Sequence, residues 1–529
     1  MTGLDIPDFH RAYDYLSHYG ESRPASEAAV CSGLRLNYRA LKRRVDECAR
    51  ALIGAGVSPG DRVAYLSPPH RDFVVVLLAT LAVGGIAVGV NPGYRRREIA
   101  HVLNDAAPSV FFSRARIGSR SYADDLTAAR PPATRLVTLG EAQDSKGSET
   151  LAQFLRRGED AGPGEPAARA DSVDGESPGL IVYTSGTTGA PKGALLRQSA
   201  ALRHGKVFLS RYRLETLRAI NCYPTNHVAG VVANALQTLV GGGALVCMEK
   251  FDAARVLSII ESERITIWGG VPTMLRMCAA HADFGTADLS SVRVLLWSGG
   301  GLGPELARTL AARVPRLATL YGITETTGGV TAIESDGFVE ALCETVGRPL
   351  PDVDIRIAGE QGETAARGEP GELLVRGACL MAGYWNNEEA TTAAINPEGW
   401  FRTGDVARID EEGCVRLLGR RIEMFKSGGY NVYPREVESV LESHAGVAAA
   451  VVVGTAHDLY GEVGAAFVQA RSPVQGVSEA TLFDHCTEHL ANYKVPKRIT
   501  VLAQLPALAN GKFDRKKLAE RADRDRGPQ

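Results

Sequence analysis

Several features that would point to a specialised environment are missing from this chain of 529 residues. Lys and Arg together number 59 against 61 Asp and Glu, so the formal net charge is −2, and no block of like charge occurs. A chain without an excess of positive charge has no bulk electrostatic attraction for nucleic acid. We therefore expect a partner other than DNA or RNA.

Long apolar runs are also scarce. Charged side chains interrupt Met1–Tyr19, which therefore lacks the continuous apolar core of a signal peptide. The most apolar segment, Phe73–Val90, reaches the lower limit for a membrane span, but Gly84 and Gly85 break it. We expect a buried helix through Val83, a glycine turn and a short buried strand, and thus no membrane span.

Cysteine pairs with C-x-x-C spacing are absent. The nine cysteines are scattered, and most stand beside apolar residues: Cys31, Cys48, Cys222, Cys247, Cys278, Cys343, Cys379, Cys414 and Cys486. An odd number of separated thiols is typical of reduced, buried or half-buried cysteines in a cytosolic protein. We expect no disulfide framework and a cytoplasmic location.

What is present is the composition of a globular protein, with 45% hydrophobic and 23% charged residues. Helical patterns alternate with short β-branched runs, which predicts a layered α/β fold with mainly parallel strands. The expected helices are Tyr38–Ile53, Phe73–Val83, Ala253–Ser262, Thr273–Ala280 and Pro304–Arg313. The expected strands are Arg62–Leu66, Ile86–Val90, Leu180–Thr184, Ala244–Cys247, Ile265–Trp268 and Val292–Trp297.

Two stretches are typical of connections. Arg156–Gly179 is rich in Gly, Pro, Ala, Asp and Glu without apolar periodicity, and we expect a mobile surface segment there. Near Gly419, β-rich sequence gives way to a new α+β pattern. We expect a large N-terminal α/β domain of layered sheets and helices over residues 1–419 and a small mobile C-terminal α+β domain over 420–529.

A phosphate-binding loop follows the predicted strand Leu180–Thr184. Tyr183–Gly193 is Y-T-S-G-T-T-G-A-P-K-G, in which glycines let backbone N–H groups approach phosphate oxygens and hydroxyls donate hydrogen bonds. Lys192 adds positive charge. The loop lacks the Gly-Lys-Ser/Thr end of a Walker loop, and a flexible Gly/Thr linker is the alternative. Its candidate ligands are Ser185, Gly186, Thr187, Thr188, Gly189 and Lys192, with Thr184 among the catalytic residues.

This segment closely resembles the signature of the adenylate-forming superfamily: acyl- and aryl-CoA synthetases, peptide-synthetase adenylation domains and luciferases. The resemblance covers nearly the whole chain in order. Further segments that match the family are Tyr321–Thr326 (YGITET), Gly371–Trp385, Trp400–Asp405 (WFRTGD), Arg420–Glu438, Tyr493–Lys497 and Asn510–Lys512. The resemblance implies acid activation by ATP through an acyl-AMP, followed by thioester formation with coenzyme A.

The resemblance also implies roles for single residues. Glu325 would hold Mg²⁺ against the ATP phosphates and Thr324 would donate to the α-phosphate, beside Tyr321 and Gly322. Asp405 would accept the ribose hydroxyls, and Arg420 would contact the nucleotide. A surface glutamate, a turn aspartate and a salt-bridge arginine are the alternatives at Glu325, Asp405 and Arg420.

Lys512 resembles the family lysine that bridges the attacking carboxylate and the α-phosphate, where an ammonium stabilises developing charge. A solvated basic patch with Lys516 and Lys517 is the alternative. His227 matches a histidine at the acyl pocket and helix start, where lining the pocket is favoured over direct chemistry. Gly299 and Gly300 would lie around substrate and adenine.

Two departures from the family pattern bear on the identity of the acid and of the acyl acceptor. Amino-acid-activating members carry an aspartate in the segment with His227, and none occurs between Asn221 and Gly230, which favours an acid without an α-amino group. At the domain boundary Ile422 takes the place of a polar hinge residue. A stiff apolar side chain that prefers burial would bias one domain orientation, which affects the second step more than the first.

The acyl acceptor therefore stays open between two candidates. The thioester-forming face is expected around Ser427, Gly428 and Gly429, where glycines would admit the pantetheine arm of coenzyme A. Ile422 keeps a second enzyme in view, a stand-alone adenylating enzyme that transfers the acyl group to an acyl carrier protein or partner enzyme. A non-catalytic nucleotide-binding protein is a remote alternative, since Lys192, Glu325, Asp405 and Lys512 are all present.

Overall fold

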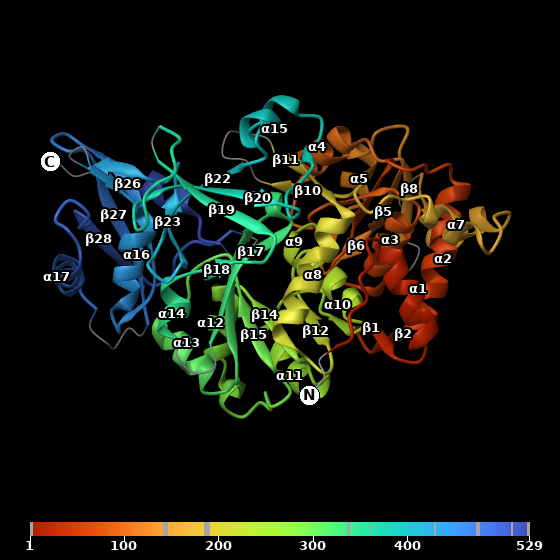
Figure 1. Cartoon of the computed structure of the whole chain (residues 1–529), viewed down its shortest axis with the longest axis horizontal. Coiled ribbons are helices and arrows are strands. Elements are labelled where there is room, and N and C mark those ends of the chain that lie inside the picture. The colour runs from red at the N-terminus through yellow and green to blue at the C-terminus, as the bar shows by residue number, and fades with distance from the viewer. Residues whose placement is uncertain are drawn as a thin grey trace.

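The computed structural model of the chain describes residues 4–140, 147–184, 191–335, 339–359, 361–427, 430–471, 477–508 and 512–525. Figure 1 shows two large sheets with helices around them, a smaller sheet beside them, and the C-terminal elements gathered at one end. The predicted combination of a large N-terminal α/β part with a small C-terminal part is confirmed.

The first large sheet has nine strands in the order β18-β17-β16-β15-β14-β12-β13-β1-β2. Its centre is parallel and fully buried, which suits continuous apolar runs, and its two ends are antiparallel. The strands are β1 (Glu27–Cys31), β2 (Leu34–Asn37), β12 (Arg218–Asn221), β13 (Ala244–Cys247), β14 (Ile267–Gly270), β15 (Val294–Trp297), β16 (Leu317–Ile323), β17 (Gly328–Ser335) and β18 (Arg348–Pro349).

The second large sheet has eight strands in the order β21-β11-β10-β4-β3-β5-β8-β9. It is parallel from β10 to β9, and the hairpin β10–β11 adds an antiparallel end. The strands are β3 (Arg62–Leu66), β4 (Ile86–Gly89), β5 (Val110–Arg114), β8 (Arg135–Leu139), β9 (Glu149–Thr150), β10 (Pro178–Thr184), β11 (Lys192–Arg197) and β21 (Gly383–Tyr384). A separate small hairpin joins β6 (Arg116–Ile117) and β7 (Arg120–Ser121).

Two further sheets lie toward the C-terminus. An antiparallel sheet contains β19 (Val353–Ala358), β20 (Gly371–Gly377), β22 (Phe401–Ile409) and β23 (Val415–Arg420). The last sheet contains β24 (Phe425–Ser427), β25 (Tyr430–Val432), β26 (Val447–His457), β27 (Gly461–Ala470) and β28 (Arg498–Leu502). Residues 421–424 connect these two sheets. The predicted boundary between 419 and 420 lies within β23, one residue before this connection, and remains a proposal.

Helices cover the sheets and the gaps between them (Figure 1). In the N-terminal part they are α1 (Ala12–Ser22), α2 (Tyr38–Gly54), α3 (Arg71–Ala82), α4 (Arg96–Ala106), α5 (Ala123–Ala129), α6 (Leu151–Leu155), α7 (Glu165–Asp171), α8 (Gln198–Tyr212), α9 (Val228–Gly230), the π-helix η2 (Val231–Leu236), α10 (Gln237–Val240), α11 (Ala253–Ser262), α12 (Pro272–Ala279), α13 (Pro304–Ala311), α14 (Glu340–Glu344) and α15 (Glu388–Ala394). The short 3₁₀ turns are η1 (Arg156–Gly158), η3 (Ala282–Gly285) and η4 (Thr324–Thr326), and the C-terminal helices are α16 (Pro434–Ser443), α17 (Glu479–His489) and α18 (Arg515–Arg524).

The predicted helices and strands match the observed bounds to within two residues at each end, and one region differs in kind. The segment Arg156–Gly179, expected as a mobile connection, instead contains η1 and α7 and packs on the domain. Ala170 is buried and its carbonyl accepts a hydrogen bond of 2.7 Å from Arg11. Gly158 lies so close to Ala51 of α2 that a Cβ would meet the backbone nitrogen at 2.7 Å. Tertiary contacts therefore order a segment without an apolar period.

The absences noted in the sequence have structural counterparts. All nine cysteines are free, and six of them are buried. Across the described ranges, no helix combines the length and apolarity that crossing a membrane requires. The segment Phe73–Val90 forms α3, a turn and β4, as expected.

Candidate active site

The buried carboxylate of Asp405 is the centre of the candidate site. Asp405 lies on β22, and its Oδ2 accepts a hydrogen bond from the hydroxyl of Tyr321 on β16. Its Oδ1 lies 2.6 Å from Nε of Arg420, and its N–H donates to Thr403 Oγ1 at 3.0 Å. Burial raises the pKa of Asp405, while the Arg420 charge opposes that rise. Two motifs distant in the sequence thus meet at one carboxylate.

Lys512 reaches the same place from the C-terminal part. Burial, followed by repulsion from Arg420, lowers the pKa of Lys512, whereas Asp405 and Glu423 favour its charged form. Solvent still reaches the lysine side chain. The structure therefore places the Lys512 ammonium within electrostatic range of the Asp405–Arg420 pair.

His227 lies within range of the same ammonium. Its side chain caps α9, and Nδ1 accepts the N–H of Ala229 at 3.2 Å, so the ring begins a helix as predicted. Although solvent reaches the ring, surrounding protein and then the charge of Lys512 lower the pKa of His227 to about 4. The imidazole is therefore neutral near pH 7, which suits lining a pocket better than donating a proton.

The phosphate-loop strands lie next to the Glu325 segment. Thr184 ends β10 and pairs with Lys192 at the start of β11, where the Thr184 hydroxyl donates to the Lys192 carbonyl at 3.4 Å. The Lys192 ammonium stands 5.4 Å from the ring centroid of Tyr384, whose hydroxyl donates to Glu325 Oε1 at 3.0 Å. Lys192 and Glu325 thus flank one tyrosine.

The glycines and Thr324 occupy tight positions around this site. A Cβ on Gly322 would lie 1.9 Å from the carbonyl oxygen of Gly328, so no side chain fits there. Thr324, in η4, is buried. Gly299 adopts φ +80° in the turn after β15, and Gly300 packs beside Pro272. Glycine at these places permits the close backbone packing at Gly322 and the left-handed turn at Gly299.

The two parts of the chain meet through arginines. The Arg435 guanidinium covers Gly301, where a Cβ would lie 2.2 Å from Nη2, and Arg435 also pairs with Glu442 at 2.9 Å. Arg276 on α12 donates to the Ala448 carbonyl on β26. Arg471 and Glu305 form an ion pair of 2.9 Å. These contacts hold the C-terminal part in the orientation that brings Lys512 to Asp405.

Ile422 and Ser427 behave differently from the other candidates. Ile422 is 65% exposed, so the burial predicted for its side chain does not occur in this orientation. An exposed apolar side chain gains no hydrophobic stabilisation, and Ile422 therefore does not favour this arrangement. Ser427 is buried in β24 and pairs with Gly461, within the C-terminal sheet.

Part of the predicted ligand set lies outside the described residues. It comprises Ser185, Gly186, Thr187, Thr188 and Gly189 of the phosphate loop together with Gly428 and Gly429. Their assignments stay predictions.

Four residues of the site were not singled out from the sequence. Tyr384, Thr403 and Glu423 lie inside segments that match the family, and this location is the sequence signal that could have identified them. Arg515 pairs with Glu423 at 3.4 Å and Glu438 at 2.6 Å, and no motif marked it. These residues position Glu325, Asp405 and the segment near Lys512 rather than offering new chemistry.

The side chains present suit a nucleoside triphosphate. Lys192, Arg420 and Lys512 supply positive charge. A carboxylate has about four lone-pair sites, so Asp405, which uses one oxygen each for Tyr321 and Arg420, can still accept two ribose hydroxyls. Within the described ranges no three or more His, Cys, Asp or Glu side chains gather to hold a metal ion. Mg²⁺ at Glu325 would therefore need phosphate oxygens and water as its other ligands.

Comparison with known proteins gives consistent matches. The family model described as "AMP-binding enzyme" matches residues 16–385, and "AMP-binding enzyme C-terminal domain" matches 436–512. Similar proteins include a feruloyl-CoA synthase from Amycolatopsis sp, 35% identical over 93% of this chain and 94% of that one. An indoleacetate–CoA ligase from Aromatoleum aromaticum is 33% identical, over 94% and 96%.

Solved structures agree along the whole chain. An amide bond synthetase from Marinactinospora thermotolerans superposes with a TM-score of 0.86 at 29% identity, covering 97% of this chain and 100% of that one. An anthranilate CoA ligase in complex with anthranoyl-AMP has a TM-score of 0.86 at 26% identity, covering 98% of each chain.

Proposed function

The chain belongs to the AMP-binding enzyme family, and from this premise we propose that it activates a ring-bearing carboxylic acid without an α-amino group, using Lys512, Asp405 and Lys192. The resemblance inferred from the motifs is thereby confirmed. The roles of the individual residues and the class of carboxylic acid are proposals.

The activity class is that of an AMP-forming acid–thiol ligase. A carboxylate oxygen of the acid attacks the α-phosphorus of ATP, the bond to the bridging oxygen breaks, and pyrophosphate leaves. The sulfur of coenzyme A then attacks the carbonyl carbon of the acyl-AMP. The carbon–oxygen bond to AMP breaks, and the thiol proton passes to solvent. ATP makes this possible because a free carboxylate is a poor electrophile.

Lys512 is assigned to the first step. Negative charge collects on the non-bridging oxygens of the α-phosphorus, and a fixed ammonium stabilises it without transferring a proton. Lys512 lies within electrostatic range of both Asp405 and His227, which supports this assignment, because we assign the first to the nucleotide and the second to the acyl side. Thr184 and Thr324 would donate to phosphate oxygens.

Lys192 and Glu325 are assigned to the leaving group. The lysine would pair with the β- and γ-phosphates, and the carboxylate would hold Mg²⁺, which neutralises phosphate charge when bound. Tyr384 lies between the two and keeps Glu325 in place through its hydrogen bond of 3.0 Å. Gly299, Gly300 and Tyr321 would border the adenosine.

The acid class is supported by three of the relatives and by one sequence feature, whereas two others, 32% and 30% identical, are named for long-chain fatty acids and medium-chain acyl groups. Relatives are named for ferulic acid, indoleacetic acid and a bicyclic propanoic acid, in the last case a ligase from Mycobacterium tuberculosis that is 34% identical over 94% of this chain. Each of these acids carries a ring, and the segment Asn221–Gly230 offers no aspartate for an amine.

The observation that carries the proposal is the meeting of Asp405, Arg420, Lys512 and His227 from four separate segments. The test is a reaction with ATP, Mg²⁺ and coenzyme A over aliphatic, aromatic and bicyclic acids, following pyrophosphate and the CoA thioester by mass. Ring-bearing acids should give both products. Pyrophosphate without any CoA thioester would point to an acyl carrier protein as acceptor, and no acid-dependent pyrophosphate would overturn the proposal.

A further inference from the structure

Helix α4 contacts the strand that leads into the predicted phosphate loop. The hydroxyl of Tyr183, on β10, donates to Oδ2 of Asp105 on α4 at 2.5 Å. Burial and the nearby carboxylate raise the pKa of Tyr183, so the hydroxyl stays protonated and remains a donor. Tyr183 directly precedes Thr184, which we assign to a phosphate oxygen. Asp105 therefore holds the neighbour of one assigned residue.

The same helix also contacts the chain where it leaves the loop. Nε2 of His101, on α4, lies 2.9 Å from the carbonyl oxygen of Pro191. A carbonyl oxygen can only accept a hydrogen bond, so Nε2 carries the proton and donates. Pro191 directly precedes Lys192, which we assign to the leaving group. His101 therefore holds the neighbour of a second assigned residue.

A third contact joins α4 to the Glu325 side of the site. The backbone carbonyl of Asp105 accepts the Nε1–H of Trp385 at 3.0 Å. The N–H of Trp385 donates to the Gly193 carbonyl on β11 at 2.7 Å. Trp385 directly follows Tyr384, whose hydroxyl donates to Glu325. Helix α4 is thus a common support for β10, β11 and β21, the strands that lead to these site residues.

Helix α4 is itself fixed by packing. Ile99, Val102 and Leu103 are fully buried in one apolar cluster with side chains of β10. His101 and Asp105 are four residues apart, so their side chains lie on one face of the helix. Both are half-buried. A helix held by its apolar face can keep such polar side chains in a defined position.

We propose that His101 and Asp105 are positioning residues for adenylation, which place Lys192 and Thr184 through the residue that precedes each of them. Neither is a catalytic residue, because each acts through another residue. A misplacement of about 1 Å at a reacting centre can cost about 100-fold in rate. Only adenylation involves the triphosphate, so the effect should be confined to that step. This inference rests on the proposed acyl-CoA ligase function.

The experiment measures the two half-reactions separately in His101→Phe and Asp105→Ala. In each variant kcat/KM for ATP, measured by acid-dependent pyrophosphate release, should fall by about ten-fold or more. Thioester formation from supplied acyl-AMP and coenzyme A should stay within about two-fold of the wild type, because no triphosphate takes part. His101→Gln should recover most of the lost rate, since its amide can donate the same hydrogen bond.

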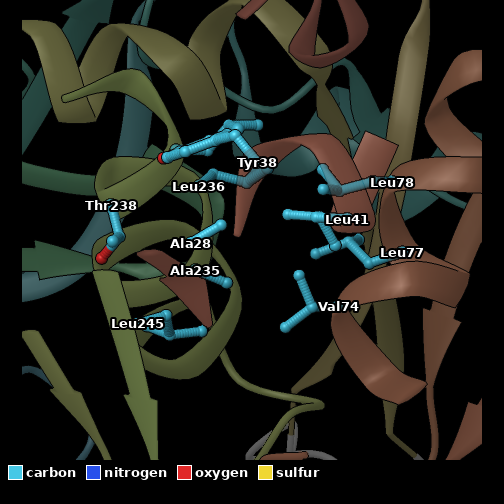
Figure 2. Close-up of a pocket in the computed structure, with 11 residues that line it drawn as sticks. Ala28, Tyr38, Leu41, Val74, Leu77, Leu78, Ala235, Leu236, Thr238 and Leu245 are labelled. Carbon is cyan, nitrogen blue, oxygen red and sulfur yellow. The ribbon is translucent and has the colours of Figure 1, made fainter. Parts of the chain in front are cut away.

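Two controls accompany these variants. Asn104→Ala changes an exposed residue of α4 next to Asp105 and should leave both half-reactions unchanged. Leu77→Val controls for lost stability. Figure 2 shows Leu77 among the side chains that line a mainly apolar cavity of about 20 Å³, which β1, α2, α3, η2, α10 and β13 enclose. This variant should lower the melting temperature without changing the ratio of the two half-reaction rates.

A double variant tests whether His101 acts through Lys192. In a Lys192→Ala background, adding His101→Phe should cost about two-fold or less in adenylation, because the side chain that it positions is gone. A further loss as large as in the wild-type background would overturn the role proposed for His101.

The failures of the two proposals are distinguishable. If the wild-type protein releases no acid-dependent pyrophosphate, the proposed function fails. If it does, but His101→Phe and Asp105→Ala keep the wild-type rates or lose both half-reactions equally, the ligase function stands and the positioning role is wrong. A loss confined to adenylation, recovered in His101→Gln and absent in Asn104→Ala, supports it.

Discussion

Arg420 closes β23 and faces Asp405 on β22, with 2.6 Å between the guanidinium Nε and the carboxylate Oδ1. The pair stands at the last residue before the connection to the C-terminal sheet. Arg420 therefore holds the carboxylate that we assign to the ribose and also stands next to the segment that leads to Lys512. Under this assignment, nucleotide binding and domain placement would be coupled through the Arg420–Asp405 contact.

Asp405→Asn should weaken ATP binding. An amide offers one acceptor oxygen in place of two and leaves Arg420 without its counter-charge, so KM for ATP should rise about ten-fold or more. The ATP dependence of pyrophosphate release measures this. Asp354→Asn is the control, because Asp354 forms an exposed ion pair of 2.8 Å with Arg376 on the same sheet. An unchanged KM in Asp405→Asn would remove the ribose assignment.

Lys512→Ala should reduce acid-dependent pyrophosphate release by about 10²- to 10³-fold, the usual effect of removing one charge-stabilising group. Thioester formation from supplied acyl-AMP should suffer much less. Lys516→Ala provides the comparison, since that exposed lysine lies on α18. Near-normal pyrophosphate release in Lys512→Ala would contradict the assignment.

Gly301→Ala should slow the first reaction by displacing the C-terminal part. Its Cβ would lie 2.2 Å from Nη2 of Arg435, which is far below contact distance. Gly303→Ala is a close control, because nothing lies within 4 Å of its Cβ position. Single-turnover pyrophosphate release should fall in the first variant and stay normal in the second. Equal rates would show that the Arg435 contact does not set the orientation.

Ile422→Lys should leave stability nearly unchanged, within about 0.5 kcal/mol, because the side chain is 65% exposed. We expect adenylation within about two-fold of the wild type and faster thioester formation, since a flexible polar side chain replaces a stiff one at the hinge. Measuring adenylation and thioester formation separately distinguishes these two effects. Unchanged thioester rates would remove Ile422 as a hinge determinant.

The buried His204 predicts a pH dependence of folding. Its folded pKa of about 3 lies below the ordinary value of 6.5, so the unfolded chain binds the proton first as pH falls. The free energy of unfolding should therefore decrease from pH 6.5 toward pH 3 and be unaffected by this group above pH 6.5. The free energy of unfolding can be measured by urea titration at several pH values. In His204→Phe its dependence on pH should correspond to about one bound proton fewer.

Much of the fold could be predicted from the sequence because the central strands are continuous apolar runs. The strands Arg62–Leu66 and Ala244–Cys247 have the predicted bounds. Helix α7 could not be predicted, because its polar, alanine-containing sequence lacks a period and is ordered by Arg11 and neighbouring helices. A local hydrophobic pattern predicts a helix or strand only where that pattern itself determines which side chains are buried.

The residues of the candidate site likewise divide into those that the sequence could predict and those that it could not. Tyr321 and Asp405 belong to recognisable motifs, and the structure brings them together. Arg435 over Gly301 could not be predicted, since it depends on how two separately folded parts are oriented.

The contacts of Arg276, Arg435 and Arg471 across the two parts also have a consequence for working conditions. They are a hydrogen bond from Arg276 to a carbonyl, the close packing of Arg435 over a glycine, and an ion pair between Arg471 and an exposed glutamate, rather than interlocked apolar side chains. Charge pairs open to water weaken as ionic strength rises, whereas apolar contacts do not. Salt concentration should therefore redistribute the molecules between domain orientations, so that the ratio of the two half-reaction rates varies with the buffer.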